Sequence, residues 1–167
     1  MLNVKVLVLS DTHIPRGGSR RLPDLVRLAA AEADVIVHAG DVVAPSVLAD
    51  LADYAPVHAV LGNNDHELVG LLPEQLELHL GGVRVAVLHD SGPSQGRPGR
   101  MRRRFRGAAV VVFGHSHQPF SAEGLDGQWL LNPGSCTERR RAPTHTFAWL
   151  TIEDDGSWRS DLVDLTD

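Results

Sequence analysis

Apolar residues in the first half of the chain fall into two alternating patterns. Short, almost unbroken apolar runs predict strands that are buried on both faces, and they cover residues 5–10, 34–41 and 56–65. Between these runs, residues 22–33 and 44–54 repeat their apolar positions with the period of a helix. This β-α-β-α-β order predicts parallel strands that are joined by right-handed crossovers.

The second half of the chain has a different pattern. A Gly-Gly pair separates two strand-like runs, residues 74–80 and 83–90, which predicts a hairpin. A short basic helix is predicted at residues 99–108. Further strands are predicted at residues 109–117, 128–135, 144–154 and 157–165. Because no repeat, linker or low-complexity segment interrupts the pattern, the sequence predicts one α/β domain with two sheets over residues 1–167.

Composition narrows the class of protein. The net charge of −5 argues against a protein that binds nucleic acid over most of its surface, although it allows a local basic binding site. The lone cysteine, Cys136, excludes a disulfide within the chain and is compatible with a reducing cytosol. No apolar run approaches the roughly 18 residues that a membrane span needs. The opening MLNVKVLVLSDTH is interpreted as a strand rather than a signal peptide, so we expect a cytoplasmic protein with no membrane partner.

Polar residues that can bind metals follow each of five apolar runs. They are Asp11, His13, Asp41, Asn63, His89, His115 and His117. Functional groups of α/β sheets collect beyond the carboxyl ends of the strands, so these side chains are predicted to surround one pocket. The spacing of two residues in DTH and in HSH would point both side chains to one side of an extended segment.

The ligand types indicate which metals suit such a pocket. Two carboxylates, one amide oxygen and four imidazoles, without a thiolate, favour manganese, iron, nickel or zinc over calcium. Seven side chains are too many for one tetrahedral zinc ion, but they suit two ions about 3.5–4 Å apart. The remaining histidines are predicted to be ordinary polar residues, and they are His38, His58, His66, His79 and His145.

The same residues, in the same order, are similar to the motifs of the calcineurin-like metallophosphoesterase superfamily. The family pattern is D-x-H, G-D, G-N-H-(D/E), H and G-H-x-H. The matching segments here are Asp11–His13, Gly40–Asp41, Gly62–Asp65, His89 and Gly114–His117. The short chain and the LNPGS at residues 131–135 most resemble the small bacterial and archaeal phosphodiesterase branch, which has Vps29 as a non-enzymatic relative.

The resemblance implies a four-layer α/β/β/α sandwich of two mixed sheets and a site for two divalent ions, most favourably Mn²⁺. One ion would be held by Asp11, His13, Asp41 and His117. The second would be held by Asp41, Asn63, His89 and His115, with Asp41 as the bridge. The implied reaction is hydrolysis of a small phosphodiester by in-line attack of a hydroxide that bridges the ions. The catalytic positions would be Asp41, Asn63, Asn64 and His89.

Two positions depart from the family pattern. Asn64 stands where the family has a catalytic histidine, and an amide cannot act as a general acid, so we expect weak activity on poor leaving groups. His66, two residues further on, is interpreted either as a substitute for that histidine or, as we favour, as a surface residue. Asp90 follows His89 where relatives have glycine, and it is expected either to orient an imidazole or, preferably, to form a turn.

Other features have two interpretations each. The arginines of the segment 96–107 are Arg97, Arg100, Arg102, Arg103, Arg104 and Arg106. They would bind phosphate or nucleic acid, or, as we favour, form a solvated helix face with salt bridges. The ERRR at 138–141 has the same ambiguity. Cys136 is expected to be inert, and GPSQG around Ser94 matches a nucleophile elbow only by letter.

Three rival functions stay open beside the dinuclear phosphodiesterase. They are a Vps29-like interaction module with a vestigial metal site, a phosphomonoesterase, and a serine hydrolase at Ser94. The complete ligand set argues against the first. Cyclic nucleotides, nucleic-acid ends and small diesters all stay open as substrates, and a homodimer would suit a protein of this size.

Overall fold

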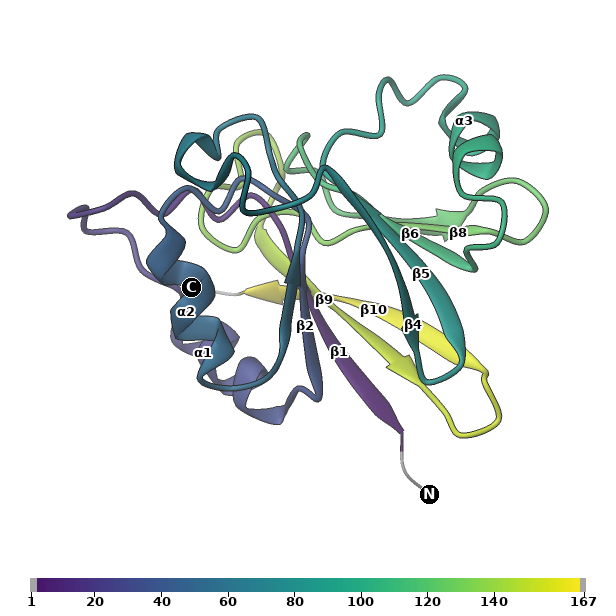
Figure 1. Cartoon of the computed structure of the whole chain (residues 1–167), viewed down its shortest axis with the longest axis horizontal. Coiled ribbons are helices and arrows are strands. Elements are labelled where there is room, and N and C mark those ends of the chain that lie inside the picture. The colour runs from purple at the N-terminus through teal and green to yellow at the C-terminus, as the bar shows by residue number, and fades with distance from the viewer. Residues whose placement is uncertain (1–2, 166–167) are drawn as a thin grey trace.

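Two five-stranded sheets stack face to face in the computed structural model, which describes residues 3–165 (Figure 1). The first sheet has the order β10-β9-β1-β2-β3. Its strands are β1 (Val4–Leu9), β2 (Val35–His38), β3 (Val57–Ala59), β9 (His145–Ile152) and β10 (Trp158–Leu165). The strands β1, β2 and β3 are parallel, whereas β9 and β10 are antiparallel to their neighbours.

The second sheet has the order β4-β5-β6-β8-β7. Its strands are β4 (Gln75–Leu80), β5 (Val83–Leu88), β6 (Val110–Val112), β7 (Phe120–Glu123) and β8 (Trp129–Asn132). The central strands β5, β6 and β8 are parallel, and antiparallel strands form both edges. As predicted, β4 and β5 form a hairpin, and its turn is Gly81-Gly82 with both glycines at positive φ.

Helices cover the outer faces of the two sheets. The first sheet is covered by α1 (Asp24–Glu32) and α2 (Pro45–Ala52), and the second by α3 (Arg97–Arg104). The strands alternate between cores as their period of two requires. In β1, Leu7 packs toward α1 and α2, whereas Val8 packs between the sheets. In β6, Val111 packs under α3. The predicted four-layer α/β/β/α sandwich is therefore confirmed.

Several boundaries differ from those predicted. The basic helix α3 begins at Arg97, directly after Gly96 in the left-handed region, and ends before Phe105, earlier than the predicted residue 108. The sequence pattern also missed β7, an edge strand without buried residues, and a short 3₁₀ helix, η1 (His66–Leu68). Within residues 3–165, no helix combines the length and the apolar character needed to cross a bilayer.

Candidate metal centre

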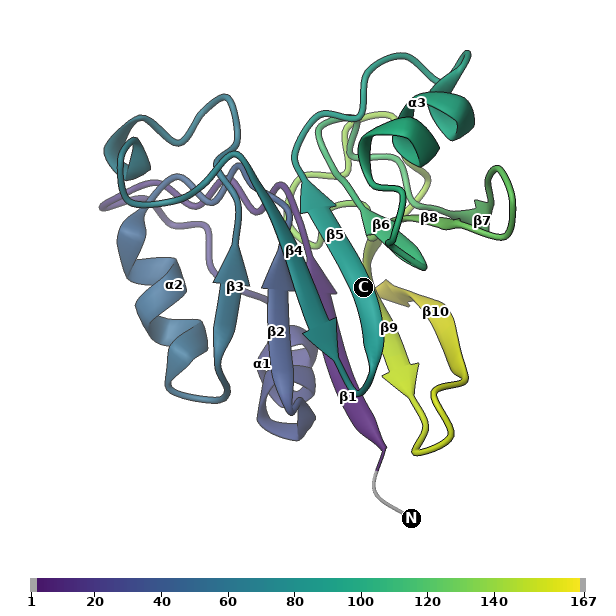
Figure 2. The same cartoon turned by 45° about the vertical axis from the view of Figure 1, so that its right-hand side comes forward.

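The seven predicted ligands all lie in loops that follow the carboxyl ends of parallel strands. Asp11 and His13 follow β1, Asp41 follows β2, and Asn63 follows β3. From the second sheet, His89 follows β5, while His115 and His117 follow β6. Figure 2 shows β2, β3 and β5 pointing toward the same end of the sandwich, where these loops meet. Each sheet therefore supplies part of one site.

Five of the seven residues have a left-handed backbone. These are Asp11, His13, Asp41, His115 and His117, with φ between 44° and 72°. Residues other than glycine rarely adopt this conformation, and it concentrates at functional sites. The DTH and HSH segments are thus not extended, and our prediction that an extended backbone aligns their side chains is wrong. Paired left-handed residues bring the side chains together instead.

Asp11, His13 and His117, here called the first ligand group, have three buried atoms that face one another without a hydrogen bond. Asn63, His89 and His115 are called the second ligand group. Asp11 Oδ1 lies 3.8 Å from His13 Nε2 and 3.5 Å from His117 Nε2. None of these three atoms has a hydrogen-bond partner within residues 3–165. A buried lone pair without a donor is costly, and a cation is a partner that suits all three atoms. The residues present therefore fit a metal ion.

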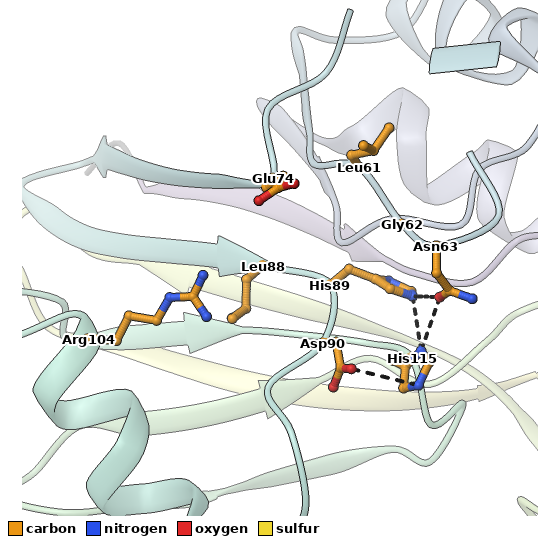
Figure 3. A pocket seen from close by; sticks show the side chains of 9 residues that line it. All are labelled: Leu61, Gly62, Asn63, Glu74, Leu88, His89, Asp90, Arg104 and His115. Carbon is orange, nitrogen blue, oxygen red and sulfur yellow. Dashed lines mark hydrogen bonds and ion pairs between the residues drawn. The ribbon is translucent and has the colours of Figure 1, made fainter. Parts of the chain in front are cut away.

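The second ligand group surrounds His89, as Figure 3 shows. His89 Nε2 lies 2.9 Å from Asn63 Oδ1 and 3.3 Å from His115 Nδ1, and His115 Nδ1 lies 3.2 Å from Asn63 Oδ1. His89 Nδ1 donates to the carbonyl oxygen of Ala39 at 2.7 Å, which leaves the lone pair of a neutral imidazole on Nε2. This ring is therefore oriented to bind a metal through Nε2.

Two carboxylates connect the two groups. Asp41 Oδ2 lies 3.3 Å from His13 Nε2 and 3.4 Å from His89 Nε2, as expected of a bridging residue. Asp11 Oδ1 is also within 3.9 Å of His89 Nε2. The ligand atoms of Asp11, His13 and His117 lie within 4.8 Å of one another, and so do those of Asp11, Asp41 and His89. Asp11 therefore lies near both ligand groups, whereas only Asp41 was predicted to do so.

The electrostatics of the site favour ionised carboxylates. Burial opposes ionisation of Asp41, but the imidazoles of His13 and His89 outweigh it and hold the pKa of Asp41 well below its usual range. Burial alone would lower the pKa of His13, yet the carboxylates of Asp11 and Asp41 raise it to about 9. Burial lowers the pKa of His117, so its imidazole is neutral near pH 7. The centre attracts positive charge, as protons or as metal ions.

Asn64 binds the Asp41 carboxylate directly. Its backbone N–H donates to Asp41 Oδ1 at 2.8 Å, and its side-chain Nδ2 donates to Asp41 Oδ2 at 2.9 Å. Asp90 forms the turn that we favoured, and its contact with an imidazole is more distant. It accepts the N–H of Gly92 in a turn at 2.8 Å, and its carboxylate lies 3.9 Å from His115 Nε2. His66 is exposed in η1.

Sequence reasoning missed the residue that holds these loops together, Asp65. Its buried carboxylate accepts backbone N–H groups from Asp41 at 2.9 Å, Gly62 at 2.7 Å and Val43 at 2.8 Å. The two loops approach so closely that a Cβ on Gly62 would lie 2.2 Å from the backbone nitrogen of Asp41. The sequence contains one signal for this role, the Asp at the end of GNND, which is part of the family motif.

The arginine cluster is less solvated than predicted. Arg100 donates to the carbonyl oxygens of Ser91 and Pro93 at 2.6–2.9 Å, so it shapes the loop that follows β5. Arg97 stacks on Phe113 with 4.7 Å between guanidinium carbon and ring centroid. Cys136 is buried, and burial raises its pKa to about 12, as expected of an inert thiol. Ser94 lies in a turn rather than directly after a strand.

Two cavities meet beside the second ligand group. One of about 310 Å³ is lined by Asn63, His89 and Arg104 among others, and Figure 3 shows it. The other, of about 550 Å³, is lined by Arg97, Phe113 and Phe120 among others. Asp90 and His115 belong to the linings of both cavities. A ligand at this edge of the metal centre therefore has room on two sides.

Comparison with known proteins agrees with this geometry. A model of the calcineurin-like phosphoesterase superfamily domain matches residues 4–155. A probable metallophosphoesterase of Methanothermobacter thermautotrophicus is 38% identical over 135 residues, or 80% of this chain and 77% of that protein. The probable metallophosphoesterase YsnB of Bacillus subtilis is 33% identical over 159 residues, or 92% of this chain and 88% of that protein.

A solved structure shows the same fold. Vps29 of Entamoeba histolytica, in a crystal structure complexed with Zn²⁺, has a TM-score of 0.76 at 23% identity and covers 96% of this chain and 99% of its own. The family match contains every predicted ligand from Asp11 to His117, so the resemblance found in the sequence is confirmed. The chain belongs to the calcineurin-like phosphoesterase superfamily.

Proposed function

We propose that this protein is a phosphodiesterase that uses two divalent ions, most favourably Mn²⁺, to hydrolyse a small phosphodiester. The observation that carries the proposal is the group of buried atoms of Asp11, His13 and His117 that face one another without hydrogen bonds. Such a group costs free energy in the absence of a cation and binds one strongly. The relatives named as probable metallophosphoesterases support the same chemistry.

The ligand groups define what each residue would do. Asp11, His13 and His117 would hold one ion and Asn63, His89 and His115 a second, with the Asp41 carboxylate between them. Bound ions would supply an activated water and would neutralise negative charge on the phosphoryl oxygens. His89 is held in the required tautomer by the Ala39 carbonyl, so it needs no rearrangement to bind.

Asn64 sets the expected range of substrates. Its side chain donates a hydrogen bond to Asp41, and an amide N–H is too weakly acidic to protonate a departing alkoxide. General acid catalysis typically contributes about 10²–10⁴-fold, so esters with good leaving groups should react much faster than alkyl esters.

The shape of the site supports a diester over a monoester. A phosphodiester carries two substituents on phosphorus, and two cavities meet at His115. A phosphomonoester would need only one of them. The proposed substrates include cyclic nucleotides and nucleic-acid ends, because both contain phosphodiester bonds. The proposal also includes a cytoplasmic location and a homodimer.

Hydrolysis of bis(p-nitrophenyl) phosphate by metal-stripped protein, before and after addition of Mn²⁺, tests the proposal. p-Nitrophenyl phosphate is measured in parallel, and Asp41→Asn is the inactive control. We expect diester turnover that requires Mn²⁺ and stops with a chelator. Faster turnover of the monoester than of the diester would favour a phosphomonoesterase over the proposed phosphodiesterase.

A Vps29-like interaction module is the second candidate, because the fold matches Vps29 along nearly the whole chain. It would be favoured if folded, Mn²⁺-loaded protein hydrolysed neither substrate.

A further inference from the structure

The turn after β8 is attached to the loop that carries Asp11 and His13. Ser135 Oγ donates to the carbonyl oxygen of Asp11 at 2.7 Å and accepts the backbone N–H of Glu138 at 2.8 Å. Thr137 Oγ1 donates to the carbonyl oxygen of Thr12 at 2.5 Å. The NPGSCTE segment therefore fixes Glu138 in place beside the first ligand group.

The Glu138 carboxylate faces two of the predicted metal ligands. Its Oε2 lies 3.7 Å from His13 Nε2 and 3.9 Å from His117 Nδ1. The backbone carbonyl of Glu138 accepts a hydrogen bond from His117 Nδ1, which directs His117 Nε2 toward Asp11. Glu138 thus approaches the centre with both its backbone and its side chain.

Glu138 Oε2 is buried and has no hydrogen-bond partner among residues 3–165. Two arginines are near the carboxylate: Arg20 Nη2 lies 3.7 Å from Oε1, and Arg140 Nη2 lies 3.7 Å from Oε2. Both distances exceed hydrogen-bond length. Oε2 is as close to His13 Nε2 as to Arg140 Nη2, at 3.7 Å, so the carboxylate is shared between the arginines and the predicted ligands.

Four buried atoms of this region have no hydrogen-bond partner among residues 3–165, and they are Asp11 Oδ1, His13 Nε2, His117 Nε2 and Glu138 Oε2. Glu138 Oε2 faces His13 Nε2 directly, and it lies on the Nδ1 side of His117. We infer that Glu138 is a further anionic residue of the metal site formed by Asp11, His13 and His117. The inference rests on the metal binding in the proposed function. It goes beyond the family motifs, because Glu138 lies outside all of them.

The inference makes the two ion sites unequal. Glu138 brings a third carboxylate to the group around His13, beside Asp11 and Asp41. The group around Asn63 also has Asp41 and Asp11, at 3.4 and 3.9 Å from His89, but its third carboxylate, Asp90, is mostly exposed to solvent. A negative charge that is more buried is screened less by solvent and strengthens binding of a divalent ion more. The site that includes Glu138 is therefore the tighter of the two.

Calorimetric titration of metal-free protein with Mn²⁺ tests this without any substrate. We compare wild type with Glu138→Gln, which keeps the side-chain shape and removes the charge. Glu67→Gln is the matched control, because it removes the same charge from an arginine pair of 2.8 Å outside the site. Glu138→Gln should weaken the tighter dissociation constant by about 10–100-fold and leave the weaker one unchanged, while the control binds as wild type does.

Thermal unfolding of the metal-free proteins separates this role from a structural one. If Glu138 only paired with Arg20 and Arg140, Glu138→Gln would lower the melting temperature without metal and leave both Mn²⁺ constants unchanged. That result would overturn the inference. If Glu138→Gln does not fold, Glu138→Asp takes its place, with an intermediate loss of affinity expected and unchanged constants again contradicting it. Failure of wild type itself to bind Mn²⁺ would instead contradict the proposed function.

Discussion

Asn64 holds both carboxylate oxygens of Asp41, one through its backbone N–H and one through its side chain. The residue that replaces the family's catalytic histidine is therefore occupied in positioning a predicted bridging ligand. This relationship explains how the loop can tolerate an amide there, and it directs the first prediction.

Asn64→His should raise turnover of diesters with poor leaving groups, because an imidazole can protonate the departing oxygen. The gain should reach at least about 10-fold, which is below the roughly 10²–10⁴-fold that a fully aligned general acid typically contributes. The measurement is the ratio of rates for a dialkyl phosphate, which has only poor leaving groups, and for bis(p-nitrophenyl) phosphate. An unchanged ratio would show that the missing acid does not limit the reaction.

Asp41→Asn should remove metal and activity together. Asp41 Oδ2 is near both His13 and His89, so neutralising it weakens both ion sites. Even residues that only orient ligands contribute about 10–100-fold to metal affinity, and we expect a larger loss here. Metal content after dialysis and diester turnover are the measurements, with the exposed Asp53→Asn as the control. Full activity of Asp41→Asn would refute the site.

Gly62→Ala should destabilise the protein and distort the site. The new Cβ would lie 2.2 Å from the backbone nitrogen and 2.3 Å from Oδ1 of Asp41. Overpacking of this kind typically costs about 1–3 kcal/mol in the free energy of unfolding. Gly99→Ala is the control, since Gly99 lies in α3 and its Cβ would meet only the flexible end of Arg103. In denaturant unfolding, the free energy of unfolding should be lowest for Gly62→Ala, and that of Gly99→Ala should equal or exceed the wild-type value.

His38 should make the protein less stable in acid. It is fully buried, its Nδ1 accepts the N–H of Gly40 at 3.2 Å, and its Nε2 lies 3.0 Å from Thr12 Oγ1. Burial lowers its pKa from 6.5 to about 4, so the unfolded chain binds a proton that the folded protein excludes. The associated stability is complete above pH 6.5 and is lost as the pH falls to 4, amounting to about 3 kcal/mol.

Urea unfolding of wild type and His38→Gln between pH 4 and pH 7.5 measures this contribution. The glutamine variant should be less stable at pH 7.5 but should lose less stability on acidification. If the stability of both proteins changed equally with pH, His38 would not be the cause of the loss of stability in acid.

The sequence predicted the ligand set because the polar residues directly follow apolar runs, and parallel strands place their ends together. It could not predict how DTH and HSH orient their side chains, since the left-handed φ of Asp11 and His115 depends on loops that meet only in the folded chain. Asp65 and Glu138 were missed for a related reason, because contacts with distant loops position both. Asp65 accepts the N–H of Asp41, and the segment before Glu138 is hydrogen-bonded to the carbonyl groups of Asp11 and Thr12. The edge strand β7 gave no signal, as its residues are not buried.

The division of the ligands between the two sheets has a mechanical consequence. Asp11, Asp41 and Asn63 extend from one sheet, and His89 and His117 extend from the other. Between the sheets lies an apolar layer that includes Val8 and Val112, and hydrogen bonds at its rim, such as that between Ser121 Oγ and Ser160 Oγ at 2.7 Å, connect the sheets. An ion bound by residues of both sheets would add a further connection across that layer. Sliding of one sheet over the other and release of the ion are therefore expected to occur as one motion.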